Sequence, residues 1–357
     1  MTQTILDSRE QMRVLDKENV LGSVEQLPDQ IEHVWGEVQK VSIPESYKNI
    51  KNVVANGMGG SGLGAHVIQT TYKENLRVPL EVLHTYDLPA YVNQETLAVL
   101  SSYSGSTEEI LESAKQAKQK NAKVMVIAAG GSLLEMAQQE QWPAFKIDPK
   151  FNPSNQPRMA IGYSVFGQVG LFHKAGLIDL SEEVVKKVVA NLRANSTNLA
   201  PESIETNTAK LLAFSALDKV ILLISAEHLE GAAHVFNNQL NENAKNLTIQ
   251  MVIPELNHHA MEGLGFPKHT KQEMITYFFT SQLYHPRVQR RFPLTIEVME
   301  ENGYQTQTIL AIGDTKLEQV WEVIQLGAYT NFYLAMLNGV DPAPIPWVDA
   351  FKEKMGK

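Results

Sequence analysis

Short apolar runs alternate with amphipathic segments along the first 150 residues. Because each run is brief and rich in branched residues, the runs predict buried strands; they lie at 53–55, 80–83, 97–100, 124–127 and 145–147. The intervening segments have apolar residues at helical spacing and predict helices at 62–72, 108–120 and 132–139. Such alternation predicts a parallel sheet with helices on both faces.

A second alternation of the same kind begins near residue 205. Its predicted strands are 220–224, 247–251, 274–279 and 306–310, and its predicted helices are 229–243, 286–301 and 316–337. A proline-rich loop at 148–157 and helical patterns at 160–175 and 181–194 separate the two alternations. We therefore expect an N-terminal helix with a first α/β domain at 1–175, a second α/β domain at 176–340, and a C-terminal lid segment at 341–357 that ends in a short helix, 346–354.

Two polar loops follow predicted strands of the first half. Gly57-Met58-Gly59-Gly60-Ser61-Gly62 follows the strand at 53–55, and Ser102-Tyr103-Ser104-Gly105-Ser106-Thr107 follows the strand at 97–100. Glycine allows backbone N–H groups to approach an anion at a helix start, and hydroxyl groups donate to its oxygens. The pair predicts a cradle for a phosphate group, formed by Gly59, Gly60, Ser61, Ser102, Ser104 and Thr107.

Each loop has a second interpretation. The first also fits the G-x-G-x-x-G pattern of dinucleotide-binding domains, and Glu81 stands roughly where the ribose-binding acid of such domains would lie. The second loop could serve only to cap a helix, through Ser106 or Thr107. A dinucleotide-binding domain has no need of a second loop dense in hydroxyl groups, so the two loops together favour phosphate.

Composition and net charge argue against several classes of protein. The 357 residues include 31 Lys and Arg against 40 Asp and Glu, giving a net charge of −9 without a basic stripe, which argues against a nucleic-acid surface. The absence of cysteine from the sequence excludes disulfides and thiolate chemistry. The first 30 residues contain scattered charges and no continuous apolar core, so we do not expect a leader there. No run of about 18 apolar residues that could span a membrane occurs in the sequence. We expect a cytoplasmic enzyme.

Five motifs in order resemble the bifunctional phosphoglucose/phosphomannose isomerase family. They are Gly57–Gly62, Ser102–Glu109, Asn155–Arg158, Asn241–Lys245 and Pro254–His258. The resemblance implies two tandem sugar isomerase (SIS) domains, each a five-stranded parallel sheet flanked by helices. It also implies an aldose–ketose isomerase that interconverts glucose-6-phosphate, and possibly mannose-6-phosphate, with fructose-6-phosphate through a cis-enediolate. Family members are homodimers.

The resemblance also implies roles for four residues. Glu242 would be the base that moves a proton between C1 and C2, and its flanking asparagines are suited to orient a carboxylate. Arg158 would stabilise the enediolate, and His258, supplied by the neighbouring subunit, would open the sugar ring. Lys352 would contact the substrate, although Lys354 competes for the same place in the motif. The chemistry requires no cofactor and no metal.

Several alternatives stay open. His258 and His259, with Glu255 and Glu262 nearby, could form a metal site, but the sequence contains no H-x-x-x-H or H-E-x-x-H spacing. The threonine that the family uses for the mannose epimer has no counterpart at 343–345. The chain could also be a non-catalytic sugar-phosphate sensor or, on its glycine pattern, an NAD-dependent oxidoreductase. The strand end at 224–228 is poor in hydroxyl groups, so we expect one phosphate site per subunit.

Overall fold

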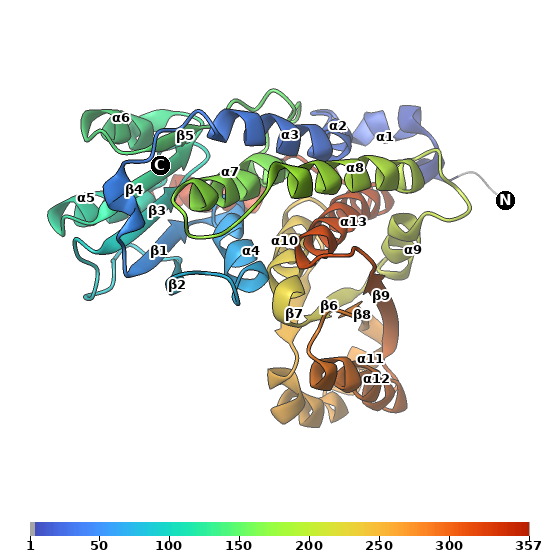
Figure 1. The fold of residues 1–357 in the computed structure, drawn as a ribbon. Coiled ribbons are helices and arrows are strands. Elements are labelled where there is room, and N and C mark those ends of the chain that lie inside the picture. Colours follow the sequence, from blue (N-terminus) through green and yellow to red (C-terminus); the bar gives the residue numbers. More distant parts are fainter. Residues whose placement is uncertain (1–3, 357) are drawn as a thin grey trace.

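The computed structural model describes residues 4–356 and places the first alternation in one parallel sheet (Figure 1). The strands are β1 (Asn52–Gly57), β2 (Leu80–Leu83), β3 (Thr96–Ser101), β4 (Lys123–Ala128) and β5 (Ala144–Lys146), in the order β2-β1-β3-β4-β5. The register pairs Gly57 with Ser101. Because parallel strands end at the same edge of the sheet, the two polar loops start side by side.

Helices bury both faces of this sheet, as the apolar runs predicted. On one face, Val54, Leu100 and Val126 pack against α5 (Glu108–Gln119) and α6 (Gly131–Gln139). On the other, Val53, Val99 and Met125 belong to a larger core that includes α3 (Leu27–Val38), α4 (Leu63–Thr71) and α7 (Ile161–Lys174). Burial on both faces explains why these strands read as continuous apolar runs rather than as alternating patterns.

The second sheet contains four parallel strands, not the five that the resemblance implied. They are β6 (Val220–Ser225), β7 (Thr248–Val252), β8 (Met274–Ser281) and β9 (Gln305–Ala311), in the order β7-β6-β8-β9. After β9 the chain enters α13 (Lys316–Leu337), which is buried along most of its length and packs on α10 (Glu230–Glu242). The helix carries the chain away from the sheet, so no strand is added beside β9.

The two faces of the second sheet are covered by different elements. One face packs on α10, and α13 lies against α10, α9 (Thr208–Ser215) and α8 (Glu182–Leu199). The other bears α11 (Thr270–Glu273), α12 (Pro286–Glu301) and two 3-10 segments, η6 (Glu255–His258) and η7 (Ala260–Gly265), at the lower end of the molecule in Figure 1. Contacts of α4 with α10 and of α3 with α8 join the two halves.

The N-terminal region and the segment before β6 differ from the sequence expectations. Instead of one N-terminal helix, the structure has α1 (Arg9–Leu15), α2 (Val20–Glu25) and α3, because short breaks at Asp16–Asn19 and Gln26 interrupt the helical pattern. The short helix α9 was not expected, whereas α14 (Pro346–Lys354) was, and no residue of α14 is buried. The division of the chain at residues 175 and 340 stays a prediction.

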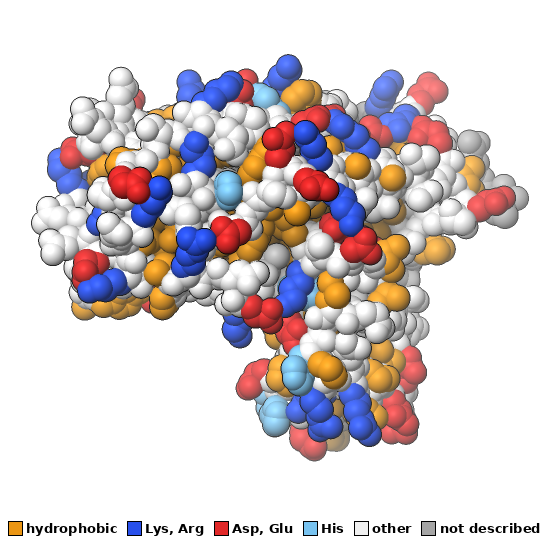
Figure 2. All heavy atoms as spheres, viewed as in Figure 1, with side chains coloured by type: hydrophobic (Ala, Val, Ile, Leu, Met, Phe, Trp, Pro, Cys, Tyr) orange, Lys and Arg blue, Asp and Glu red, His pale blue; other side chains and the backbone are white. Residues whose placement is uncertain are grey.

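The charged side chains on the visible surface are dispersed, in agreement with the charge pattern of the sequence (Figure 2). Acidic and basic side chains intermingle on the face shown in Figure 2, without a continuous basic stripe on that face. Between residues 4 and 356 no helix has the length and apolar character that a bilayer crossing requires.

Candidate active site

A hydrogen bond joins the two polar loops at the carboxyl edge of the first sheet. The backbone N–H of Tyr103 donates to Ser61 Oγ at 2.9 Å. Within the second loop, the hydroxyl groups of Ser102 and Thr107 lie 2.7 Å apart, and the N–H of Gly105 donates to Ser102 Oγ at 3.1 Å. The structure therefore places most of the predicted phosphate-binding groups in one connected cluster.

The capping interpretation of the second loop does not fit the structure. Thr107 occupies the N-cap position of α5 by its backbone, but its side chain makes no capping hydrogen bond and instead pairs with Ser102. The start of α4, at Gly62, likewise has no side-chain cap. Neither Gly62 nor Thr107 thus caps its helix with a side chain, an arrangement compatible with an anion at these helix starts.

Two glycines in this cluster stand where the backbone approaches other segments closely. Gly105 has φ +70°, and a Cβ placed on it would lie 1.7 Å from the carbonyl oxygen of Gly130. A Cβ on Gly60 would lie 3.1 Å from Arg158 Cα, so the first loop packs directly on the backbone of Arg158. The phosphate cradle and the predicted catalytic arginine are therefore neighbours.

Arg158 is buried, with only 2 % of its side chain exposed. Its Nη1 donates to Gln156 Oε1 at 2.9 Å, its Nη2 donates to Pro342 O at 2.8 Å and also to Ala343 O, and its Nε donates to Asn243 Oδ1. Burial lowers the pKa of Arg158, while Glu242 opposes that shift. The guanidinium thus holds the segment before α14 against the site.

Glu242 lies beside Arg158, as the resemblance implied. The distance from Arg158 Nη1 to Glu242 Oε2 is 3.8 Å, and 27 % of the Glu242 side chain is exposed. Burial raises the pKa of Glu242, and the nearby cations of Arg158, Lys245 and Lys352 oppose the rise. A partly exposed carboxyl group whose pKa is raised is better suited to take up and return a proton than an ordinary surface glutamate.

The asparagines that flank Glu242 have other partners than its carboxylate. Asn243 accepts from Arg158 and donates to Asn331 Oδ1 at 2.8 Å, while Asn241 donates to the carbonyl oxygen of Asn237 at 2.9 Å. Gln239 completes this buried network by donating to Arg158 O at 3.0 Å. The network therefore positions the arginine, and the expectation that the asparagines orient the carboxylate is wrong.

Lys245 is a site residue that the sequence interpretation did not single out. Its Nζ donates to the carbonyl oxygens of Glu242 and Pro342, at 2.5 and 3.2 Å. Burial, reinforced by Arg158, lowers its pKa to about 8. Its membership of the Asn241–Lys245 motif was the available signal, but a lysine three residues after a helical glutamate also fits an ordinary surface pair.

The two C-terminal lysines differ in their relation to Glu242. Both lie on α14 and are exposed, but only Lys352 acts electrostatically on Glu242. Asp349, on the same helix, acts on Arg158. The structure thus brings α14 to the site and favours Lys352 over Lys354.

His258 lies away from these residues within one chain. It is exposed at the end of η6, beyond the carboxyl end of β7, whereas Glu242 precedes the amino end of that strand. The five residues of β7 span about 16 Å. One copy of the chain therefore does not bring His258 to Glu242.

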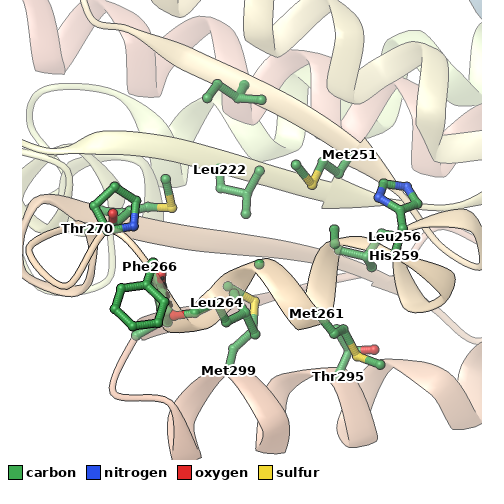
Figure 3. Close-up of a pocket in the computed structure, with 16 residues that line it drawn as sticks. Leu222, Met251, Leu256, His259, Met261, Leu264, Phe266, Thr270, Thr295 and Met299 are labelled. Carbon is green, nitrogen blue, oxygen red and sulfur yellow. Dashed lines mark hydrogen bonds between the residues drawn. The ribbon is translucent and has the colours of Figure 1, made fainter.

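The neighbourhood of His258 also bears on the metal alternative. His259 Nε2 lies 3.9 Å from Glu255 Oε1. Over residues 4–356, no three His, Asp or Glu side chains are grouped so that they could hold a metal ion. His259 instead lines an apolar pocket of about 440 Å³ on the outer face of the second sheet (Figure 3), remote from the phosphate cradle.

The end of β6 and the side chain of Glu81 bear on two other expectations, a single phosphate site per subunit and the dinucleotide alternative. At the end of β6, the carboxylate of Glu227 accepts from His285 N at 3.1 Å, and the buried ring of His228 lies 2.9 Å from Gln319 Oε1. These partners differ from the open hydroxyl cluster of the first sheet. Glu81, the candidate ribose-binding acid, accepts from the hydroxyl group of Tyr91.

Solved structures with a similar fold agree with this architecture. A hypothetical protein from Thermus thermophilus superposes with a TM-score of 0.72 at 18 % identity, over 94 % of this chain and 89 % of its own. A glucose-6-phosphate isomerase like protein from the same organism superposes with a TM-score of 0.60 at 20 % identity, over 95 % and 98 % of the two chains. At these identities the likeness shows the fold.

Sequence comparison gives the family. A SIS domain model matches residues 46–138, and a model of the bacterial phospho-glucose isomerase C-terminal SIS domain matches residues 205–355. A bifunctional phosphoglucose/phosphomannose isomerase from Caldicellulosiruptor bescii is 34 % identical over 94 % of this chain and 98 % of its own. One from Aquifex aeolicus is 26 % identical over 95 % and 99 %. This chain belongs to the bifunctional phosphoglucose/phosphomannose isomerase family.

Proposed function

We propose that this enzyme interconverts glucose-6-phosphate and mannose-6-phosphate with fructose-6-phosphate. Two relatives that match nearly the whole chain are named for both isomerase activities. The observation that carries the proposal is the packing of the Gly60 loop on Arg158, which in turn lies 3.8 Å from Glu242. A phosphate-binding cluster, a cation and a base therefore meet within the reach of one hexose phosphate.

The phosphate would bind at the cradle formed by the two loops. Ser61 Oγ already accepts from Tyr103 N, which leaves its O–H free to donate. The Ser102 and Thr107 hydroxyl groups share one hydrogen bond, so the proton of one of them remains available. The N–H groups of Gly59 and Gly60, with Ser104 Oγ, would complete the donor set.

Glu242 would then move the proton. In the open-chain aldose its carboxylate takes the proton from C2, the C–H electrons form the C1–C2 double bond, and the carbonyl π electrons move to the oxygen on C1. The proton of the C2 hydroxyl group passes to that oxygen, the C2 carbonyl forms, and C1 takes back the proton held by Glu242 to give the ketose. Arg158 Nη1 faces Glu242 and supplies positive charge where the enediolate oxygens develop.

Ring opening is assigned to His258 of a second subunit. Since one chain does not bring His258 to Glu242, the proposal includes a homodimer in which the partner's His258 protonates the ring oxygen. The mannose reaction needs one further step, in which the open chain rotates about C2–C3 so that Glu242 meets the opposite face of C2. No cofactor enters either reaction.

A coupled assay tests the proposal. Protein treated with EDTA is given fructose-6-phosphate, and glucose-6-phosphate and mannose-6-phosphate are followed separately. Both products are expected, and glucose-6-phosphate alone would remove the mannose half. If neither forms although fructose-6-phosphate raises the melting temperature, the chain is a sugar-phosphate sensor. Stabilisation by NAD and not by the sugar phosphate would instead favour the oxidoreductase.

A further inference from the structure

The C-terminal helix α14 carries an apolar stripe that its own chain leaves uncovered. Trp347, Phe351 and Met355 are 87 %, 65 % and 57 % exposed, and their spacing of four residues places them on one side of the helix. No residue of α14 is buried. A helix of nine residues is marginal in water by itself, so its stability calls for a surface that covers this stripe.

A second uncovered apolar surface lies on the outer face of the second sheet. The pocket of about 440 Å³ lies between β7, η7 and α12, and Met251, Met261, Leu264 and Met299 are among the residues that line it (Figure 3). Phe266 stands largely exposed at the pocket. Methionine side chains adapt their shape to a partner, so the pocket suits an inserted aromatic side chain.

The α14 of the same chain does not reach this pocket. Arg158 holds Pro342 and Ala343, close before α14, against α10 through its hydrogen bonds to their carbonyl oxygens. The helix α10 packs on one face of the second sheet, and the pocket lies on the other face. The start of α14 is therefore tied to the side of the second sheet opposite the pocket, so the pairing of the stripe with the pocket calls for another copy of the chain.

Each surface carries charged residues of both signs. The last turn of α14 carries Lys352 and Lys354, which could pair with Glu255 and Glu262, exposed on η6 and η7 beside the pocket. Asp349 and Glu353 on α14, and Lys268 and Lys271 near the pocket, offer a second set of opposite charges.

We infer that α14 of one copy docks through Trp347, Phe351 and Met355 into the pocket of a second copy. A two-fold axis would make the contact reciprocal, so that each pocket receives the partner's helix. The inference rests on the proposed function in its homodimer. It adds which surfaces meet: the pocket wall continues into η6, which carries His258, and α14 carries Lys352 toward Glu242.

Cross-linking tests the pairing directly, because the chain has no cysteine of its own. Met261→Cys and Phe351→Cys proteins are mixed and oxidised, and a disulfide-linked pair that needs both variants is expected. Glu353→Cys, on the opposite side of α14, is the matched control and should cross-link at least ten-fold less. Equal cross-linking of the two α14 variants, or a disulfide within one chain of the double variant, would overturn the inference.

Sedimentation velocity gives a second readout. Phe351→Asp should raise the dimer dissociation constant at least ten-fold without lowering the melting temperature of the monomer, since the Phe351 side chain is 65 % exposed in its own chain. Val14→Asp, an exposed apolar position on α1, should leave the dimer intact. A Phe351→Asp dimer as tight as wild type would refute the docking. A protein that cross-links as expected but lacks isomerase activity would refute the proposed function instead.

Discussion

Arg158→Lys is the substitution that tests most sharply how the site is held together. The guanidinium donates to four acceptors that lie on three segments of the chain: Gln156, Asn243, and the carbonyl oxygens of Pro342 and Ala343. A lysine ammonium donates from a single atom and cannot span that set. We therefore expect at least one buried acceptor to lose its partner while the positive charge is kept.

The expected cost follows from these contacts. A buried polar group without a hydrogen bond costs about 1–3 kcal/mol, so one or two such groups predict a loss of about 1–6 kcal/mol in the free energy of unfolding. Urea denaturation followed by circular dichroism measures this loss, and kcat for fructose-6-phosphate should fall with it. The lysine ammonium, unlike Nη1, would no longer be fixed beside Glu242.

Arg77→Lys is the matched control. Its Nη2 lies 3.1 Å from Asp179 Oδ1 in an exposed ion pair, for which a change below about 0.5 kcal/mol is expected. If Arg158→Lys also changes the free energy of unfolding by less than about 0.5 kcal/mol and keeps its kcat, the buried network does not hold the site as described.

Three further predictions concern catalysis. Glu242→Gln should abolish isomerisation and exchange of the C2 proton, while calorimetry should show that the variant still binds substrate. Retention of most of kcat would remove Glu242 from the base role. In wild type, the raised pKa of Glu242 predicts that activity falls with decreasing pH already above the usual pKa range of glutamate. Lys245 should lose its charge above pH about 8, so Lys245→Arg should extend activity to more alkaline pH, and an unmoved alkaline limb would mean that this charge is not needed. Ser104→Ala with Thr107→Ala should raise KM for the phosphorylated sugar at least several-fold, whereas an unchanged KM would show that these hydroxyl groups do not bind the phosphate.

Local patterns were sufficient for the elements that lead into the site. The strands β1 and β3, the helices α5 and α13, and the order of the two glycine- and serine-rich loops follow from apolar periodicity and from the turn chemistry of glycine. The adjacency of the loops depended in addition on the order of the strands in the sheet, because β1 and β3 are neighbours there although β2 lies between them in the sequence. Arg158 and Glu242 lie in motifs that the resemblance to the family identified, and the structure places them together.

The partners of those residues depended on contacts between distant segments. Asn243 binds Arg158, 85 positions earlier, and Lys245 reaches Pro342, 97 positions later; neither contact has a periodic signature in the sequence. The burial that shifts the pKa values of Glu242 and Lys245 likewise arises only when α10, η4 (Pro157–Met159) and the segment before α14 assemble.

The sequence by itself determined the alternation of strands and helices, the two loops of the cradle and the family, because these are properties of short segments and of their order. Only the tertiary structure decided the four-stranded second sheet, the amide network around Arg158, the separation of His258 from Glu242 within one chain, and the exposed stripe of α14. The physical reason is that burial and hydrogen-bond pairing are set by which segments meet in space, and local apolar patterning leaves that choice open.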